Sequence, residues 1–342
     1  MAVTDWGIGI VGLGGIAGQH LKAYQARGLP VVAGADPDPR AREARASEYG
    51  ISAVYEDVAE LVADPRVRVV DVTAPHYLRI REPIFQAAAE AGKAIFCQKP
   101  LAETLEEART LVRIADSGGV PLMVNQNSLF APGFLALEPY LRDDAWVGMP
   151  YYFQVENRDW MDPSRHPWYG KSHRWVTANM GIHHYALIRH WFGDADSVYA
   201  LFCKDPSQTG AEGETLSVLS VKFRNGVSGV VINNWCYRGD RPRAHAREEV
   251  VIQGTRGAIT GDAEGICVTT AGDHSARIYP EIRGAWFPDA FGASMNHFLE
   301  ALDTGRPYLC SGHDNLKTVA IAEAAYLSAE HSREVKLAEL GA

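Results

Sequence analysis

Three polar residues in the sequence, Lys99, Asn179 and His183, could act together on an alcohol group. His183 can take a proton as a general base, because imidazole titrates near neutral pH. Lys99 can supply a cation that stabilises a developing alkoxide, and the proline after it restricts its backbone to extended conformations. Asn179 precedes His183 by four residues, so the two share one face if the segment is helical. We predict catalytic roles for all three; the alternatives are a surface lysine, a helix N-cap asparagine and a hydrogen-bonded core histidine.

A glycine-rich segment near the N-terminus has the spacing of a dinucleotide-binding loop. Residues 12–17 read Gly-Leu-Gly-Gly-Ile-Ala, between a strand-like run and a helical one. The glycines permit a tight turn and close approach of a pyrophosphate, and a small Ala17 lets helix and strand pack closely. Asp36, at the end of the next predicted strand, can bind the adenosine ribose, which favours NAD over NADP although Arg40 and Arg42 lie nearby. We predict cofactor contacts from Gly12, Gly14, Gly15, Ile16, Ala17, Asp36 and Arg40. The alternative is a glycine-rich structural turn.

The elements around this loop alternate between strand and helix. Buried, β-branched strands separated by helices favour a parallel, doubly wound sheet. The sequence therefore predicts an α/β Rossmann domain over residues 1–126. Its predicted strands are 7–11, 31–35, 67–72, 94–97 and 120–125, and its predicted helices are 16–27, 40–49, 78–91 and 104–117, the last with a capping box from Thr104 to Glu107.

Beyond residue 126 the pattern changes to longer alternating runs separated by Gly, Asn and Asp turns. Asn225-Gly226 is typical of a hairpin. We predict an α+β domain over residues 127–342, with a large, mostly antiparallel open sheet for substrate binding and oligomerisation. Its predicted strands are 151–156, 197–203, 215–223, 227–235 and 247–253, and its predicted helices are 179–191, 289–303 and 314–331. The last helix is a candidate to pack back on the first domain.

More positions match one family than a Rossmann fold alone explains. Besides the glycine loop, the matching segments are 72–75, 97–100, Asn127 with 130–132, 179–183 and 323–328. The chain resembles the Gfo/Idh/MocA family of oxidoreductases over essentially its whole length. The resemblance implies Lys99 near the nicotinamide and the reacting hydroxyl, His183 as acid/base, and a homodimer or homotetramer. It also implies cofactor contacts from Thr73, Ala74, Pro75, Gln98, Lys99 and Asn127.

The predicted site is less anionic than the usual one in that family. Gln98 stands where relatives usually have Glu before Lys-Pro, and Asn179 stands where they usually have Asp before Gly-x-His. Residues 173–177 are bulky where a glycine-rich segment is common. With these departures the chain resembles a sub-branch of the family that has Gln-Lys-Pro and includes pentose dehydrogenases such as those for apiose.

Residues 157–175 are rich in aromatic, His and Arg side chains, a composition that suits a sugar-binding wall. The same composition suits a surface loop in an oligomer. The predicted substrate contacts are Lys99, Arg158, Trp160, His166, Asn179, His183 and His184, although His184 also fits a purely structural role.

Composition limits the partners of this chain. It has 342 residues, a net charge of −9 and no Lys/Arg run, which argues against nucleic acid. No apolar run reaches the roughly 18–20 residues of a membrane span. Five scattered cysteines without a C-x-x-C pair indicate reduced thiols in a cytoplasmic protein. The 12 histidines show no ligand spacing, so we expect no metal.

These features predict reversible hydride transfer between NAD and a secondary or hemiacetal hydroxyl of a sugar, glycoside or polyol. One alternative is a redox-neutral enzyme that oxidises its sugar transiently, eliminates, hydrolyses or epimerises, and then reduces it again. A second alternative is a non-catalytic NAD-binding sensor.

Overall fold

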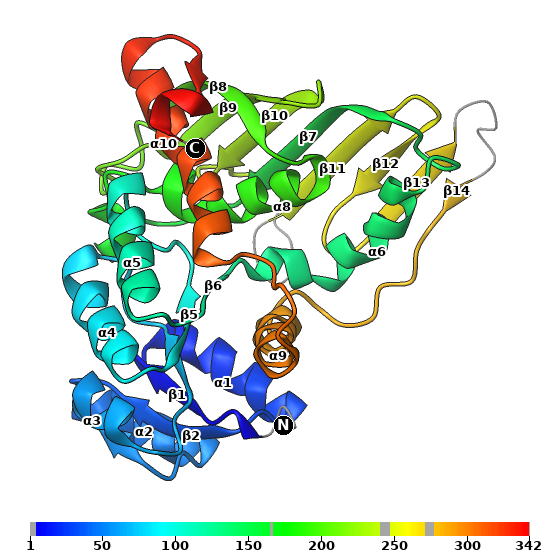
Figure 1. Ribbon diagram of the computed structural model, residues 1–342. Helices are drawn as coiled ribbons and strands as arrows, with labels where there is room; N and C mark the ends of the chain where they lie inside the picture. The colour runs from blue at the N-terminus through cyan, green and yellow to red at the C-terminus, as the bar shows by residue number, and fades with distance from the viewer. Residues whose placement is uncertain (1–4, 165–166, 240–246, 271–276, 342) are drawn as a thin grey trace. The chain divides into compact units, whose positions relative to one another are not determined.

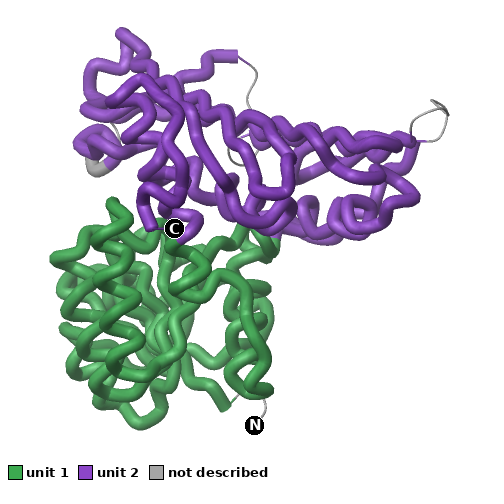
Figure 2. The backbone as a smooth tube through the Cα atoms, turned by 45° about the horizontal axis from the view of Figure 1, so that its top comes forward, with its two compact units in different colours: residues 1–130, 287–316 green, residues 131–286, 317–342 purple. Residues whose placement is uncertain are grey.

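The computed structural model describes residues 5–164, 167–239, 247–270 and 277–341, and the chain folds into two compact units (Figure 1). Unit 1 comprises residues 1–130 and 287–316, and unit 2 comprises residues 131–286 and 317–342 (Figure 2). The sequence placed the first boundary at residue 126 and assigned residues 287–316 to the second domain. In the structure this segment groups with unit 1 instead.

Unit 1 is built on a six-stranded sheet in the order β3-β2-β1-β4-β5-β6, and every pair of neighbours is parallel. This confirms the predicted doubly wound α/β fold. The strands are β1 (Ile8–Val11), β2 (Val31–Ala35), β3 (Val54–Tyr55), β4 (Val69–Val72), β5 (Ala94–Gln98) and β6 (Leu122–Asn125). The helices are α1 (Gly15–Arg27), α2 (Pro39–Tyr49), α3 (Val58–Ala63), α4 (Leu78–Glu90), α5 (Leu105–Ser117) and α9 (Asp289–Thr304). Sequence analysis missed β3 and α3, which are too short to show a period.

Side-chain packing explains why α9 joins this unit. Phe291 of α9 lies 5.0 Å from the ring of His20 in α1, and Phe298 lies 5.9 Å from Phe96 in β5. The helix therefore closes one face of the sheet, and the central strands are fully buried, as parallel strands usually are. The predicted capping box at Thr104 and Glu107 is present at the start of α5.

Unit 2 is built on a nine-stranded sheet in the order β14-β13-β12-β11-β7-β10-β9-β8-β15. The β7–β10 pair is parallel and the other pairs are antiparallel, so the sheet is mostly antiparallel as predicted. The strands are β7 (Pro150–Arg158), β8 (Ala195–Cys203), β9 (Leu216–Phe223), β10 (Ser228–Asn234), β11 (Arg247–Gly254), β12 (Gly257–Gly261), β13 (Ile266–Thr270), β14 (Arg277–Ile278) and β15 (Val335–Lys336). The expected hairpin joins β9 to β10, with Gly226 at φ +92°.

One face of this sheet carries helices. Phe153 of β7 stacks on Phe192 of α8 (Ile182–Phe192), and Phe134 of α6 (Pro132–Arg142) meets Trp191 of α8 edge-on. The longest helix among the described residues is α10 (Gly312–His331), and the helical segments not yet named are short turns. No helix in the described part of the chain is long and apolar enough to cross a membrane.

Candidate active site

The glycine loop lies where β1 passes into α1. Gly12 has a φ of +91°, and a Cβ there would lie 2.7 Å from the backbone nitrogen of Ala74, so only glycine fits. Around Gly14 and Gly15 a Cβ would meet nothing within 4 Å, so the helix N-terminus is open. The backbone N–H groups and the dipole of a 13-residue helix suit an anion here, which fits a dinucleotide pyrophosphate. The structure thus brings together the predicted loop residues Gly12, Gly14, Gly15, Ile16 and Ala17.

Asp36, at the end of β2, is tied to the same loop. Its Oδ2 accepts a hydrogen bond from the Leu13 N–H at 2.7 Å, and its Oδ1 accepts one from the Asp38 N–H at 2.8 Å. Arg45 of α2 donates to two carbonyl groups of the loop at 3.3 and 3.1 Å; sequence analysis did not single it out, because an arginine in a polar helix gives no signal. The predicted Arg40 is exposed in the first turn of α2.

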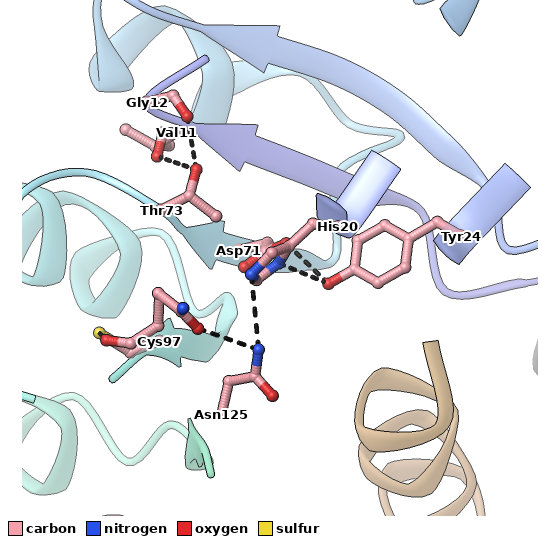
Figure 3. A network of polar contacts seen from close by, with 9 residues as sticks. Val11, Gly12, His20, Tyr24, Asp71, Thr73, Cys97 and Asn125 are labelled. Carbon is pink, nitrogen blue, oxygen red and sulfur yellow. Dashed lines mark hydrogen bonds and ion pairs between the residues drawn. The ribbon is translucent and has the colours of Figure 1, made fainter. Parts of the chain in front are cut away.

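A buried arginine holds the loop that follows β4. Arg81 of α4 is only 1% exposed and donates to the carbonyl groups of Ala74 at 3.0 Å and Leu101 at 2.9 Å. The Thr73 hydroxyl lies against the carbonyl groups of residues 11 and 12 (Figure 3). Of the predicted residues here, Thr73 and Ala74 are buried and Pro75 is exposed. Arg81 was missed because a charged residue in an amphipathic helix usually faces solvent.

Lys99 follows β5 and precedes a cis peptide bond to Pro100. Burial, followed by the charge of Arg81, lowers the pKa of Lys99 to about 8. Burial, Arg81 and Lys99 together lower the pKa of His76 to about 3, so this imidazole is neutral at pH 7. Sequence analysis missed His76. Burial and the Arg81 charge at this edge of the sheet thus bring the pKa of Lys99 close to the working pH range.

Buried amides lie beside Lys99 at the same edge. Asn125, at the end of β6, donates from Nδ2 to Oε1 of Gln98 at 3.0 Å. Asn127 is fully buried in the 3-10 turn Asn127–Phe130. The carboxyl ends of β1, β2, β4, β5 and β6 thus gather the predicted cofactor residues of unit 1.

In unit 2, Asn179 and His183 lie in two different kinds of helical turn. The sequence predicted one helix from 179 to 191, with Asn179 as a possible cap. The structure corrects this, because residues Val176–Met180 form a π-helical turn and α8 begins at Ile182. The N–H of Gly181 donates to the carbonyl of Val176 at 2.7 Å, and a Cβ at Gly181 would lie 2.5 Å from the Tyr185 hydroxyl. π-helical turns are rare and often mark functional sites.

Residues of α10 and the β8–β9 connection brace this turn. The Glu214 carboxylate accepts hydrogen bonds from the Thr177 N–H at 2.9 Å and from the Tyr326 hydroxyl at 2.7 Å. Burial raises the pKa of Glu214. Arg174 makes two 2.8 Å hydrogen bonds to the carboxylate of Glu323. The bulky segment 173–177 is therefore held by the helix whose residues 323–328 the sequence singled out.

The two adjacent histidines of α8 have different surroundings. His183 is 8% exposed and its ring meets Trp286 edge-on, with 5.7 Å between centroids. His184 is 1% exposed, and its Nδ1 lies 3.4 Å from Nδ2 of Asn157 in β7. Asn157 was missed by sequence analysis. A strand partner for His184 favours the structural role that the sequence left open.

Arg158 is not brought together with His183. Side chains alternate along β7, so Asn157 faces α8 and Arg158 lies on the opposite face of the sheet. There Arg158 pairs with Glu156 and Glu249. Trp160 lies under the Arg238 guanidinium, 5.3 Å from it, and His166 lies outside the described residues. Among the described residues, no group of three or more His, Cys, Asp or Glu could hold a metal ion.

Comparison with known proteins identifies relatives along the whole chain. Residues 6–126 match a family model described as "Oxidoreductase family, NAD-binding Rossmann fold", and residues 146–337 match the C-terminal alpha/beta domain of the same family. A D-apiose dehydrogenase of Paraburkholderia graminis is 31% identical over 97% of this chain and 90% of its own length. An inositol 2-dehydrogenase of Rhizobium meliloti is 25% identical over 96% and 98%.

A solved structure matches the fold over nearly the whole chain. A crystal structure of an oxidoreductase from Agrobacterium radiobacter, in complex with NAD+, L-tartaric acid and magnesium, superposes with a TM-score of 0.88. It is 25% identical and covers 98% of this chain and 100% of its own.

Gly14→Ala tests the loop without disturbing the fold. The new methyl group meets no protein atom within 4 Å, so the thermal midpoint should stay within about 2 °C of the wild type. It occupies space that a pyrophosphate needs, so NADH binding should weaken by about 10-fold or more in a fluorescence titration. Gly265→Ala, at an equally open glycine of unit 2, is the control and should change neither quantity. Undiminished NADH affinity in Gly14→Ala would contradict the placement of the dinucleotide.

Proposed function

Because the chain belongs to the Gfo/Idh/MocA family of oxidoreductases, with its NAD-binding Rossmann fold, we propose that Lys99, Asn179 and His183 carry its reaction on a sugar or polyol hydroxyl. The observation that carries the proposal is Lys99, whose pKa is lowered to about 8 at the same sheet edge as the dinucleotide loop. NAD, when bound, supplies the hydride acceptor or donor. The glycine loop and Asp36 hold its phosphate and adenosine-ribose groups.

We propose a different role toward the substrate for each of the three side chains. The Lys99 ammonium donates to the substrate oxygen and stabilises its developing negative charge. The His183 imidazole removes the hydroxyl proton in oxidation and returns it in reduction. The amide of Asn179 orients a neighbouring hydroxyl, since an amide can donate and accept hydrogen bonds but cannot take the proton.

The names of two relatives and the neutral side chains of Gln98 and Asn179 support a proposal for the substrate class. The relatives at 31% and 25% identity are named for apiose, a sugar, and for inositol, a cyclic polyol. We propose a secondary or hemiacetal hydroxyl of such a compound as the reacting group. Neutral Gln98 and Asn179, in place of two usual acids, leave Lys99 and His183 as the ionisable groups of the reaction.

A panel of monosaccharides, glycosides and polyols with NAD and NADP tests this function. We expect reduced nicotinamide to form with NAD and at least one polyhydroxylated substrate, with NADP less effective because Asp36 would repel a 2′-phosphate. Cofactor that stays bound through purification, with substrate consumed and no net NADH, would replace the proposal by a redox-neutral reaction. NAD binding without turnover of any substrate would favour a sensor.

His183→Ala should lower kcat by about 10²–10⁴-fold, because it removes the general base. NADH affinity and the thermal midpoint should stay near the wild-type values. His190→Gln is the matched control: His190 lies in the last turn of the same helix and pairs with Glu138 at 2.8 Å. Loss of activity in both variants alike would point to a damaged helix and against a general base at 183.

Lys99 should set an alkaline limit for alcohol oxidation. Its pKa of about 8 means that the cation is present below that pH and is lost above it. Activity that depends on the cation, measured as kcat/KM against pH, should therefore fall above about pH 8. A guanidinium stays protonated up to about pH 12, so Lys99→Arg should be slower but should lose this limit. An unchanged alkaline limb in Lys99→Arg would assign the titration to another group.

We propose a homodimer or homotetramer formed through the open face of the unit 2 sheet. Leu201 of β8 is 55% exposed and pairs across the strands with Val218 of β9, which pairs with Ile232 of β10. The neighbouring Tyr199 is 38% exposed. A continuous apolar row on a sheet face is typical of a contact with another chain. We also propose dinucleotide binding for unit 1, substrate binding for unit 2, and a cytoplasmic location, which five cysteines without a disulfide bond support.

Leu201→Lys should lower the molar mass measured by light scattering after gel filtration. The reason is that a charge at the most exposed end of the apolar row would be buried on association. Leu135→Lys, at a leucine of α6 that is 43% exposed, is the control and should leave the mass unchanged. A wild-type protein that is monomeric at all concentrations would contradict the proposal.

A further inference from the structure

A chain of buried polar side chains runs from α1 to the carboxyl end of β5 (Figure 3). Nδ1 of His20 lies 2.8 Å from Oδ2 of Asp71, and the Tyr24 hydroxyl donates to the same oxygen at 2.7 Å. On the other side of the ring, Nε2 of His20 lies 3.4 Å from Nδ2 of Asn125. The same Nδ2 donates to Oε1 of Gln98 at 3.0 Å. His20, Asp71 and Asn125 are fully buried, and Gln98 is 5% exposed.

The orientations of the Asn125 and Gln98 amides in the structure indicate where the hydrogens lie along this chain. The Asp71 carboxylate can only accept, so Nδ1 of His20 carries a hydrogen. Nδ2 of Asn125 can only donate, so in this orientation Nε2 of His20 presents its lone pair to it. The two hydrogens of the Asn125 amide then point to Nε2 of His20 and to Oε1 of Gln98. The Gln98 amide is thereby turned with its oxygen toward Asn125 and its Nε2 away from it.

Only one other arrangement satisfies the same contacts. In it, a hydrogen on Nε2 of His20 would require the oxygen of Asn125 to face the ring. Gln98 would then have to turn its Nε2 toward Asn125 and its carbonyl oxygen away. The state of His20 and the orientation of Asn125 therefore decide whether position 98 presents an N–H donor or a carbonyl acceptor. The rings of Phe291 and Phe96, with centroids 5.0 and 6.3 Å from that of His20, help to hold the imidazole in place.

We propose that His20 and Asn125 are positioning residues that hold Gln98 with its amide N–H toward the bound dinucleotide. This inference rests on the proposed function and on the cofactor contact that the family resemblance implies for Gln98. It assigns a role to a buried pair that takes no part in proton transfer. It also gives meaning to the Gln at position 98: a glutamate there would accept the same hydrogen bond from Asn125 but would present an oxygen to the ligand.

A double-mutant cycle on NADH affinity tests the proposal with the full-length protein. Asn125→Asp has nearly the same shape but cannot donate, so it should draw Nε2 of Gln98 inward and present the carbonyl to the ligand. Gln98→Met removes the amide. Each variant should weaken NADH binding by about 3- to 10-fold, the worth of one hydrogen bond. The double variant should bind no more weakly than Gln98→Met alone, because without the amide there is no orientation to set.

Tyr24→Phe is the matched control, because it removes the hydroxyl that contacts Asp71 and Nδ1 of His20 but leaves the contacts of Asn125 with His20 and Gln98. It should lower the thermal midpoint and leave the NADH Kd within about 2-fold. Additive losses in the double variant, or an unchanged Kd in folded Asn125→Asp, would overturn the proposal. If Asn125→Asp does not fold, Asn125→Ala in the same cycle decides it. A wild-type protein that does not bind NADH would instead contradict the proposed function, so failure of this inference and failure of the proposed function are distinguishable.

Discussion

Parallel pairing of the six strands in unit 1 is the constraint on which the rest depends. Every strand points the same way, so the chain leaves each of them at the same edge of the sheet. That edge carries Gly12 after β1, Asp36 after β2, Thr73 after β4, Lys99 after β5 and Asn125 at the end of β6. Residues spread over more than 100 positions of sequence thereby lie at one edge of the sheet, each directly after a strand or at its end.

A buried guanidinium links the shape of this edge to its chemistry. A charge out of water is tolerated only when its hydrogen bonds are made, and Arg81 makes them to backbone carbonyls, including those of Ala74 and Leu101. Burial, followed by the same charge, lowers the pKa of Lys99 to about 8. One side chain thus holds the loop after β4 and the turn after β5, and it adds to the effect of burial on the lysine.

Unit 2 presents its polar residues by different means. A π-helical turn, braced by Glu214, carries Asn179, and Gly181 allows the close approach of the Tyr185 hydroxyl at the start of α8. In the sheet that α8 covers, successive side chains of a strand point to opposite faces. Asn157 faces the helix and contacts His184, whereas its neighbour Arg158 joins an ion-pair cluster on the other face.

The sequence predicted the parallel sheet, the dinucleotide loop, the Asn225-Gly226 hairpin and the capping box at Thr104, because each depends on local spacing within a few residues. It could not find Arg81, His76 or Arg45, since a charged or polar residue in a helix reads as a surface residue until its tertiary neighbours are known. It also predicted a substrate contact for Arg158 without indicating that this side chain lies on the face of β7 opposite Asn157, because composition carries no information about which face of a strand a side chain occupies. The π turn at Asn179, the grouping of residues 287–316 with unit 1 and the contacts of His20 became known only from the folded structure. Those depend on packing between segments that are distant in sequence, which local patterns do not encode.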